Sequence, residues 1–141
     1  MSVAASVAQH ERDGRPERPI TFDDFFAGYA DARAIFDVLR AEIEALGPVE
    51  IRVTRSQVAF RRDAPFAWAW VPDRYLGGGH APLVLSVSLV ERDASPRWKQ
   101  VVEPAAGRFM HHLELRSAVD IDAEVLEWIR RARAVADEEA G

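Results

Sequence analysis

Two adjacent histidines, His111 and His112, are the residues of this chain whose types and spacing raise the sharpest chemical question. They lie in the stretch RFMHHLELRS, residues 108–117. Its pattern predicts a β-strand, in which successive side chains point to opposite faces of the sheet. His111 then shares a face with apolar residues and His112 shares one with polar residues. The pair therefore cannot chelate one metal ion from the same face.

Neither histidine belongs to a recognisable metal or catalytic motif. The chain has no cysteine, which excludes a disulfide, a thiolate zinc site, an iron–sulfur cluster and thiol catalysis. No HxH, HxxxH, HExxH or GxSxG spacing occurs, so the sequence predicts no metal site and no cofactor. Two readings stay open for each residue. His111 is a core histidine or a pocket histidine, and His112 is a surface residue or a member of a polar site.

Arginines and indoles can gather on the face of the sheet that carries His112. If strand pairing is regular, this face collects Arg52, Gln57, Arg61, Ser86, Ser88 and Arg108. Trp68 and Trp70 share a strand and lie together on one face or the other. Such a surface could bind a planar or anionic molecule, or its arginines could simply pair with nearby carboxylates. A one-residue bulge would exchange the two faces.

A long connection over residues 93–107 adds two basic candidates. Ser95 followed by a proline predicts a short helix, because serine caps helices and proline favours the first helical position. Arg97 and Lys99 near its start would favour an anion. The alternative is a surface flap that Trp98 anchors. Lys99 is the only lysine in the chain, which indicates a bias toward arginine and is no evidence of a Schiff base.

The elements that must position these residues predict an α+β fold. In chain order, we expect a helix over residues 31–46, five strands over residues 49–54, 57–62, 66–71, 83–90 and 108–115, and a helix over residues 117–139. There is no βαβ alternation. We therefore expect an antiparallel sheet with the N- and C-terminal helices packed on one face. Thr21 with Asp24, and Ser117 with Asp120, have the spacing of capping boxes.

Length and composition predict one small globular domain. The chain has 141 residues, of which 48% are hydrophobic and 29% charged, enough for a single core. Residues 1–20 are polar and contain prolines, so we expect a disordered tail before a domain over residues 21–139. No secretory signal is recognisable, and no stretch approaches the ~20 apolar residues of a membrane span. We therefore expect a cytoplasmic protein without a membrane partner.

Charge is distributed unevenly along a chain whose net charge is −5. Residues 51–116 carry ten basic and six acidic side chains, whereas residues 21–50 carry seven acidic and two basic ones. Residues 117–141 carry seven acidic and three basic ones. Basic charge thus concentrates in the predicted sheet, as solvated edges or as part of a site for an anionic ligand. The acidic balance argues against a general nucleic-acid-binding protein.

Several stretches together resemble a bacterial family known as a domain of unknown function, DUF5655. They are DFFAG, AIFDVLRAEIEALGPVEIRVTRSQVAFRR, FAWAWVP, SPRWKQVVEPAAGRFMHHLELRS and DAEVLEWIRRA. The resemblance implies the same α+β fold and a stand-alone member, and it brings no established activity. The family's histidine in the last strand matches His111 better than His112. Its aromatic residue followed by a basic one matches Phe60 and Arg61.

Our leading expectation is a non-catalytic domain that binds a small anionic ligand or a protein partner. The candidate site consists of Arg52, Arg61, Trp68, Trp70, Arg97, Lys99, Arg108 and one of His111 and His112. The runner-up is an enzyme in which one of these histidines is the general acid or base beside an arginine. A third class is a protein-interaction module with an exposed tryptophan patch. The oligomeric state stays open.

Overall fold

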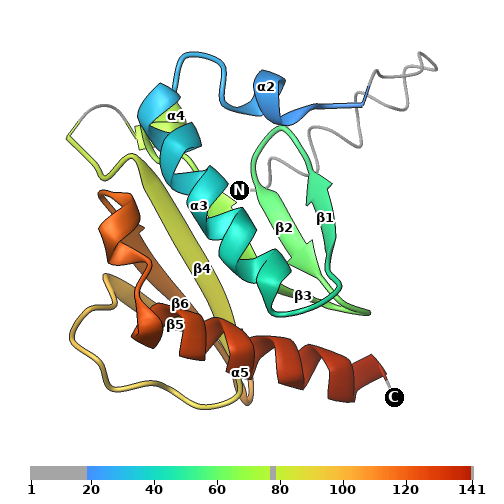
Figure 1. Cartoon of the computed structure of the whole chain (residues 1–141). Helices are drawn as coiled ribbons and strands as arrows, with labels where there is room; N and C mark the ends of the chain where they lie inside the picture. Colours follow the sequence, from blue (N-terminus) through green and yellow to red (C-terminus); the bar gives the residue numbers. More distant parts are fainter. Residues whose placement is uncertain (1–18, 77–78, 141) are drawn as a thin grey trace, which may run out of the picture.

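Helices cover one face of an antiparallel sheet in the computed structural model of the chain (Figure 1). The structure describes residues 19–76 and 79–140, so most of the predicted tail lies outside the described residues. The helices are α2 (Phe22–Phe25), α3 (Ala30–Ala45), α4 (Asp73–Leu76) and α5 (Ala123–Ala140), with a 3-10 turn η1 (Ala118–Asp120) before α5. The strands are β1 (Glu50–Val53), β2 (Val58–Arg61), β3 (Pro65–Trp70), β4 (Leu83–Leu89), β5 (Gln100–Ala105) and β6 (Arg108–Leu115). The predicted α+β class is confirmed.

The sheet has six strands in the order β1-β2-β3-β4-β6-β5, and each neighbouring pair is antiparallel. This is one strand more than the sequence predicts. The additional strand is β5, within the connection where we expected a short helix. Ser95 Oγ does accept the Arg97 N–H at 3.2 Å, but the chain makes only a turn there. Pro104 can lie in β5 because this strand is at the edge of the sheet, where one row of N–H groups needs no partner.

The core lies between the sheet and the two long helices. Ile35, Phe36, Leu39 and Ile43 form the buried stripe of α3, as the helical spacing predicts. The ring of Phe36 stacks on that of Phe60 in β2, with centroids 6.0 Å apart. Each large apolar side chain buried in this way contributes about 1.5–3 kcal/mol. The stripe thus holds α3 across the sheet.

The C-terminal segment contains two successive helical elements, η1 and α5, and each has its own capping residue. Ser117 and Asp120 form the predicted capping box, but it caps the single turn η1 and not the long helix. Asp122 Oδ1 then accepts the Val125 N–H at 3.1 Å, and α5 starts at Ala123. The prediction of one helix over residues 117–139 is therefore wrong at its start, because a second capping residue follows the first. No helix in the described parts of the chain is long and apolar enough to span a membrane.

The other face of the sheet carries neither α3 nor α5, which lie together in front of the strands (Figure 1). We call it the open face. By strand register and alternation it is formed by Glu50, Arg52, Ala59, Arg61, Trp68, Trp70, Val84, Ser86, Ser88, Gln100, Val102, Arg108, Met110, His112 and Glu114.

Candidate functional site

Strand β6 separates the two histidines as its alternation predicts. His111 is fully buried on the helix-covered face. Its Nε2 accepts the backbone N–H of Asp93 at 2.9 Å, and its Nδ1 lies 3.0 Å from the carbonyl oxygen of Phe109. A backbone N–H can only donate, so the imidazole carries its proton on Nδ1 and donates it to Phe109. Burial lowers the pKa of His111 and keeps it neutral.

A group of polar and aromatic side chains surrounds His111 and holds the connection between β4 and β5 on the core. We call Asp93, Trp98, His111 and Trp128 the loop anchor. Asp93 Oδ2 accepts the Trp98 indole N–H at 2.9 Å, and the Trp98 ring lies 4.8 Å from His111 and 4.1 Å from Trp128. The predicted anchoring role of Trp98 fits this geometry. With both nitrogens bonded to backbone groups, His111 has a structural role.

His112 lies half-buried on the open face, at the end of a short hydrogen-bond network. Its Nδ1 is 2.7 Å from Ser86 Oγ, and Trp70 Nε1 is 3.3 Å from the same oxygen. An indole N–H can only donate. Ser86 Oγ therefore accepts from Trp70, and it can donate its own hydrogen to His112 Nδ1. With Ser86 as the donor, the proton of the neutral imidazole is on Nε2.

Burial and the neighbouring His111 lower the pKa of His112. No group within the described residues makes a hydrogen bond or an ion pair with its Nε2. The Nε2–H thus has no partner in the part of the chain that the structure describes, and it is available on the open face as a donor. Ser86 orients the imidazole through its hydrogen bond. Since Ser86 is only 4% exposed, its own hydroxyl is shielded from solvent.

Register brings both indoles to the same face as His112. Trp68 pairs with Ser86 across β3 and β4, Ser86 pairs with His112 across β4 and β6, and His112 pairs with Gln100 across β6 and β5. These residues form one row across the sheet. Trp70, two positions along β3, leans toward the row and bonds to Ser86. An indole pair beside a histidine donor is therefore the centre of the open face.

Basic side chains border this centre at both edges of the sheet. On the β1–β2 side, Glu50 pairs with Arg61 at 3.1 Å and with Arg52 at 3.6 Å. On the β5–β6 side, Glu114 Oε2 lies 3.6 Å from Lys99 Nζ, and its other oxygen lies 3.4 Å from Arg116. Each carboxylate is shared by two cations. These four cations outnumber the two carboxylates that they share, although the whole chain carries a net charge of −5.

The family model for the domain of unknown function DUF5655 matches residues 22–133. The chain belongs to the DUF5655 family. The match begins in α2 and ends within α5, so it contains every strand, the loop anchor and the open face. No curated protein and no solved structure matches the chain. The family description names no activity for this DUF5655 domain.

Two of the sequence-predicted candidates lie away from the open face of the DUF5655 domain. His111 belongs to the loop anchor. Arg97 bonds to Asp122 at 3.0 Å and to Glu124 at 2.8 Å. Its guanidinium also lies 5.7 Å from the ring centroid of Trp128. These bonds raise the pKa of Arg97, the one to Glu124 most. Arg97 thus joins the connection between β4 and β5 to the start of α5.

The other seven candidates gather on or beside the open face. They are Arg52, Arg61, Trp68, Trp70, Lys99, Arg108 and His112. The sequence reasoning missed Gln100 and the role of Glu50. Gln100 was missed because β5 was not predicted. Glu50 could have been found, since alternation places it on the same face as Arg52.

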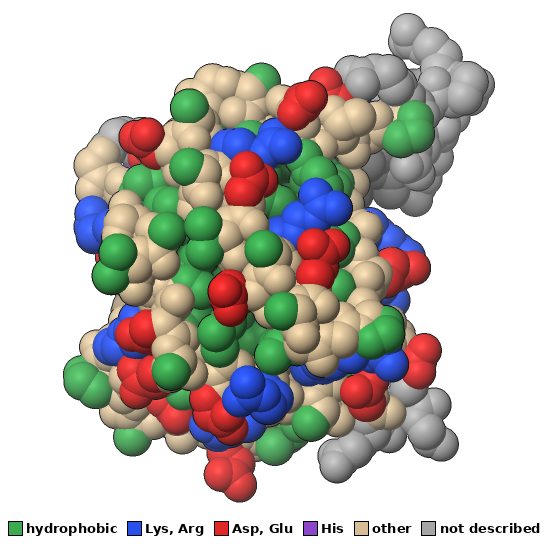
Figure 2. Space-filling model, in the orientation of Figure 1, with side chains coloured by type: hydrophobic (Ala, Val, Ile, Leu, Met, Phe, Trp, Pro, Cys, Tyr) green, Lys and Arg blue, Asp and Glu red, His purple; other side chains and the backbone are tan. Residues whose placement is uncertain are grey.

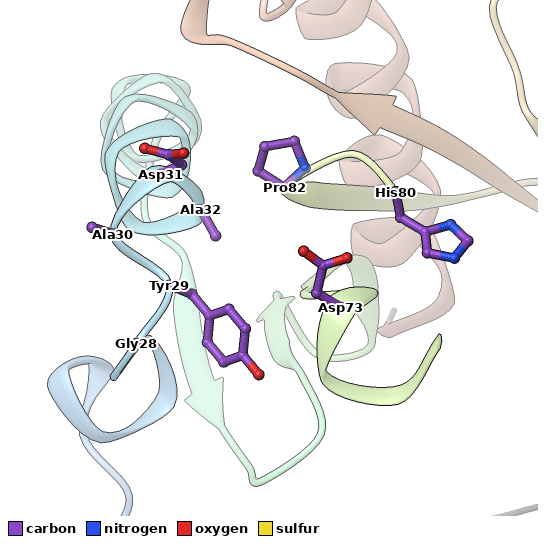
Figure 3. A pocket seen from close by; sticks show the side chains of 8 residues that line it. All are labelled: Gly28, Tyr29, Ala30, Asp31, Ala32, Asp73, His80 and Pro82. Atoms are coloured by element: carbon purple, nitrogen blue, oxygen red, sulfur yellow. The ribbon is translucent and has the colours of Figure 1, made fainter. Parts of the chain in front are cut away.

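A separate pocket of about 490 Å³ lies at the start of α3 (Figure 3). It is lined by Gly28, Tyr29, Ala30, Asp31, Ala32, Asp73, His80 and Pro82. The imidazole of His80 points away from the carboxylate of Asp73. Within residues 19–76 and 79–140, no three His, Cys, Asp or Glu side chains are placed to hold a metal ion. Two carboxylates and no described Lys or Arg line this pocket, which makes it unsuitable for an anion.

Charges on the helix-covered side are mixed. Figure 2 shows basic and acidic side chains interspersed over α3 and α5. One such pair joins Arg33 on α3 to Asp37 at 3.0 Å, one turn further along the helix. Pairs of this kind are typical of a solvated helix face and contribute little individually. Neither sign of charge predominates on this side.

Proposed function

We propose that this DUF5655 domain is a non-catalytic binding domain whose open face holds a small anionic ligand. The observation that carries the proposal is the Trp70–Ser86–His112 network. It orients the imidazole and leaves Nε2 without a partner among the described residues, so that its N–H is available as a donor. Oriented donors beside apolar, aromatic surface are what small-molecule sites use to set specificity.

Charge supports an anion as the ligand. Arg52 and Lys99, at opposite edges of the open face, are 59% and 57% exposed in their side chains. Their ion pairs are long, at 3.6 Å each, and exposed pairs of this kind are weak. An incoming carboxylate or phosphate can therefore compete for these cations. In an otherwise acidic chain, this face offers the favourable potential for a negative ligand.

The geometry favours binding over catalysis. Ser86 and His112 are in contact, but Ser86 is shielded, and no carboxylate in the described residues bonds to the imidazole. A serine nucleophile needs to be accessible, and its histidine needs an orienting partner on the far nitrogen. No described hydrogen bond joins an arginine to His112 either. We place this binding domain in the bacterial cytoplasm, a compartment that suits a chain without cysteine.

The test uses the four indole N–H signals of the protein. Trp68 and Trp70 are on the open face, whereas Trp98 and Trp128 are in the loop anchor. We expect titration with a panel of nucleotides, phosphorylated metabolites and carboxylates to shift the first two signals and to leave the other two in place. Each signal is assigned with a Trp→Phe variant, and sodium chloride at equal ionic strength is the control for screening.

Two arginine variants make the test specific. Arg52→Ala should weaken the binding of an active anion by up to about fivefold, the range for loss of an exposed charge contact. Arg40→Ala, on α3 and paired with Glu44 at 3.4 Å, removes a matched charge from the opposite side. It should leave the affinity unchanged. Binding that moves only the loop-anchor indoles, or that responds equally to both variants, would contradict the proposal.

A further inference from the structure

The two histidines differ in whether their hydrogen bonds survive protonation. His111 Nε2 accepts from the backbone N–H of Asp93, and that group cannot become an acceptor. His112 Nδ1 faces the hydroxyl of Ser86, which can reverse its role by rotating its hydrogen. With its two lone pairs, Ser86 Oγ can accept from Trp70 and from a protonated His112 at the same time. Protonation of His112 therefore keeps the network connected.

No carboxylate among the described residues bonds to the His112 imidazole in the free protein. On its own strand the neighbouring acid is Glu114, which already pairs with Lys99 and Arg116. From β4 the imidazole meets the neutral Ser86, and from β5 it meets the neutral Gln100. The remaining titratable or charged neighbours on β6 are His111 and Arg108. None of these groups favours a positive charge on the imidazole. An anionic ligand would supply the negative charge that stabilises a protonated His112.

The indoles define the rest of the ligand. Trp68 is in register with Ser86, and Trp70 bonds to Ser86, so both rings border the hydroxyl that orients His112. Neither indole is fully exposed, and both offer an apolar surface next to the donor. When the flat ring of a ligand stacks on an indole, a charged group attached to that ring lies beside the two stacked rings. A group carried on such a ring can then reach the imidazole.

From this arrangement, and resting on the proposed function, we infer that the ligand is an aromatic anion whose binding transfers a proton from solvent to His112. The ring packs on Trp68 and Trp70, and the negative group accepts a hydrogen bond from His112 Nε2. The free protein, the ligand and one solvent proton combine into the complex, and no covalent bond changes. By linkage, the ligand then binds more tightly as the pH falls.

Benzenesulfonate is a suitable probe, because its sulfonate stays ionised throughout the range studied. We expect its dissociation constant, measured from the Trp68 and Trp70 indole shifts, to decrease severalfold between pH 7.5 and pH 5.5. The upper limit for one coupled proton is tenfold per pH unit. Calorimetry in two buffers of different ionisation enthalpy should show proton uptake on binding. Sulfate, which lacks the ring, and benzyl alcohol, which lacks the charge, should both bind more weakly.

His112→Asn separates this coupling from the binding itself. Its amide oxygen can accept from Ser86 in place of Nδ1, but the side chain does not titrate. The variant loses the Nε2–H donor, so it should bind benzenesulfonate more weakly than the wild type, with an affinity independent of pH and without proton uptake. His80→Asn, at the separate pocket near α3, is the control and should behave like the wild type.

The outcomes separate the inference from the proposed function. Benzenesulfonate that shifts the Trp68 and Trp70 signals equally well at every pH would overturn the inference and leave the binding face in place. Equal affinities for sulfate and benzenesulfonate would overturn the aromatic requirement. If no anion shifts these two signals, the proposed function fails together with the inference.

Discussion

Acid should destabilise this protein in a pH range set by histidine. His111 is fully buried, and both of its ring nitrogens bond to backbone groups. Burial lowers its pKa from 6.5. In the unfolded chain the same imidazole is free to take a proton. Below pH 6.5 the unfolded state therefore binds more protons than the folded state, and the free energy of unfolding falls as the pH falls.

The size of the effect follows from the linkage relation. As long as His111 stays neutral in the folded state, each pH unit below the unfolded pKa removes about 1.4 kcal/mol. From pH 7 to pH 5 the loss from this one residue is thus at most about 2 kcal/mol. The loss stops once the pH passes the folded pKa. Since burial also lowers the pKa of His112, this residue adds a loss of the same sign.

Urea unfolding between pH 5 and pH 7, followed by tryptophan fluorescence, measures this slope. Urea is preferable to guanidinium because it leaves the ionic strength unchanged. His111→Gln keeps an acceptor for the Asp93 N–H and does not titrate. The variant should be less stable at pH 7 by about 1–3 kcal/mol, because Phe109 loses its donor. Its stability should also depend less on pH than that of the wild type. His80→Asn, at a partly exposed histidine, is the matched control.

Two results would refute the reasoning. The first is a pH dependence of His111→Gln that equals that of the wild type over this range. The second is a wild-type stability that stays constant from pH 7 to pH 5. The carboxyl groups of Asp93 and Asp122 have pKa values lowered from 3.8. Their contribution is lost only as the pH falls below this range.

Three substitutions test the contacts that hold the fold. Trp98→Phe removes the indole N–H bonded to Asp93 and should lower the free energy of unfolding by about 2 kcal/mol, the value for a hydrogen bond to a charged group. Asp93→Ala also removes the acceptor of the Ser95 N–H; it should cost more than Trp98→Phe in the same urea assay. Gly47→Ala places a Cβ 2.8 Å from an Arg133 nitrogen at a φ of +138°, so its melting temperature should fall, with a cost of about 1–2 kcal/mol. A Gly47→Ala melt equal to that of the wild type would show that the turn after α3 is not strained.

Local patterns in the sequence determined much of this fold. The apolar stripe of α3, its end at Gly47, the capping box at Thr21 and the opposite orientation of His111 and His112 all follow from nearest neighbours along the chain. Helical and strand periods are local properties, so a pattern of a few residues suffices to predict them. The same patterns supported the α+β class and the resemblance to DUF5655.

Tertiary structure alone decided where these pieces meet. Arg97 was expected beside an anion, but it pairs with Asp122 and Glu124, more than twenty residues away in the sequence. Residues 100–105 form strand β5 because they pair with β6. Their own strand propensity is weak, since the stretch contains proline and alanine, and it does not predict a strand. Local spacing cannot predict such long-range partners.

The candidate site depends on the same long-range choices. Alternation predicts that Trp68 and Trp70 share a face, but not which face the helices cover. The register of β3, β4 and β6 brings Trp70, Ser86 and His112 to one point. A shift of one residue in any of these strands would turn its side chains to the other face. The sequence thus determined the two sides of each strand, and packing of the helices decided which side became the open face.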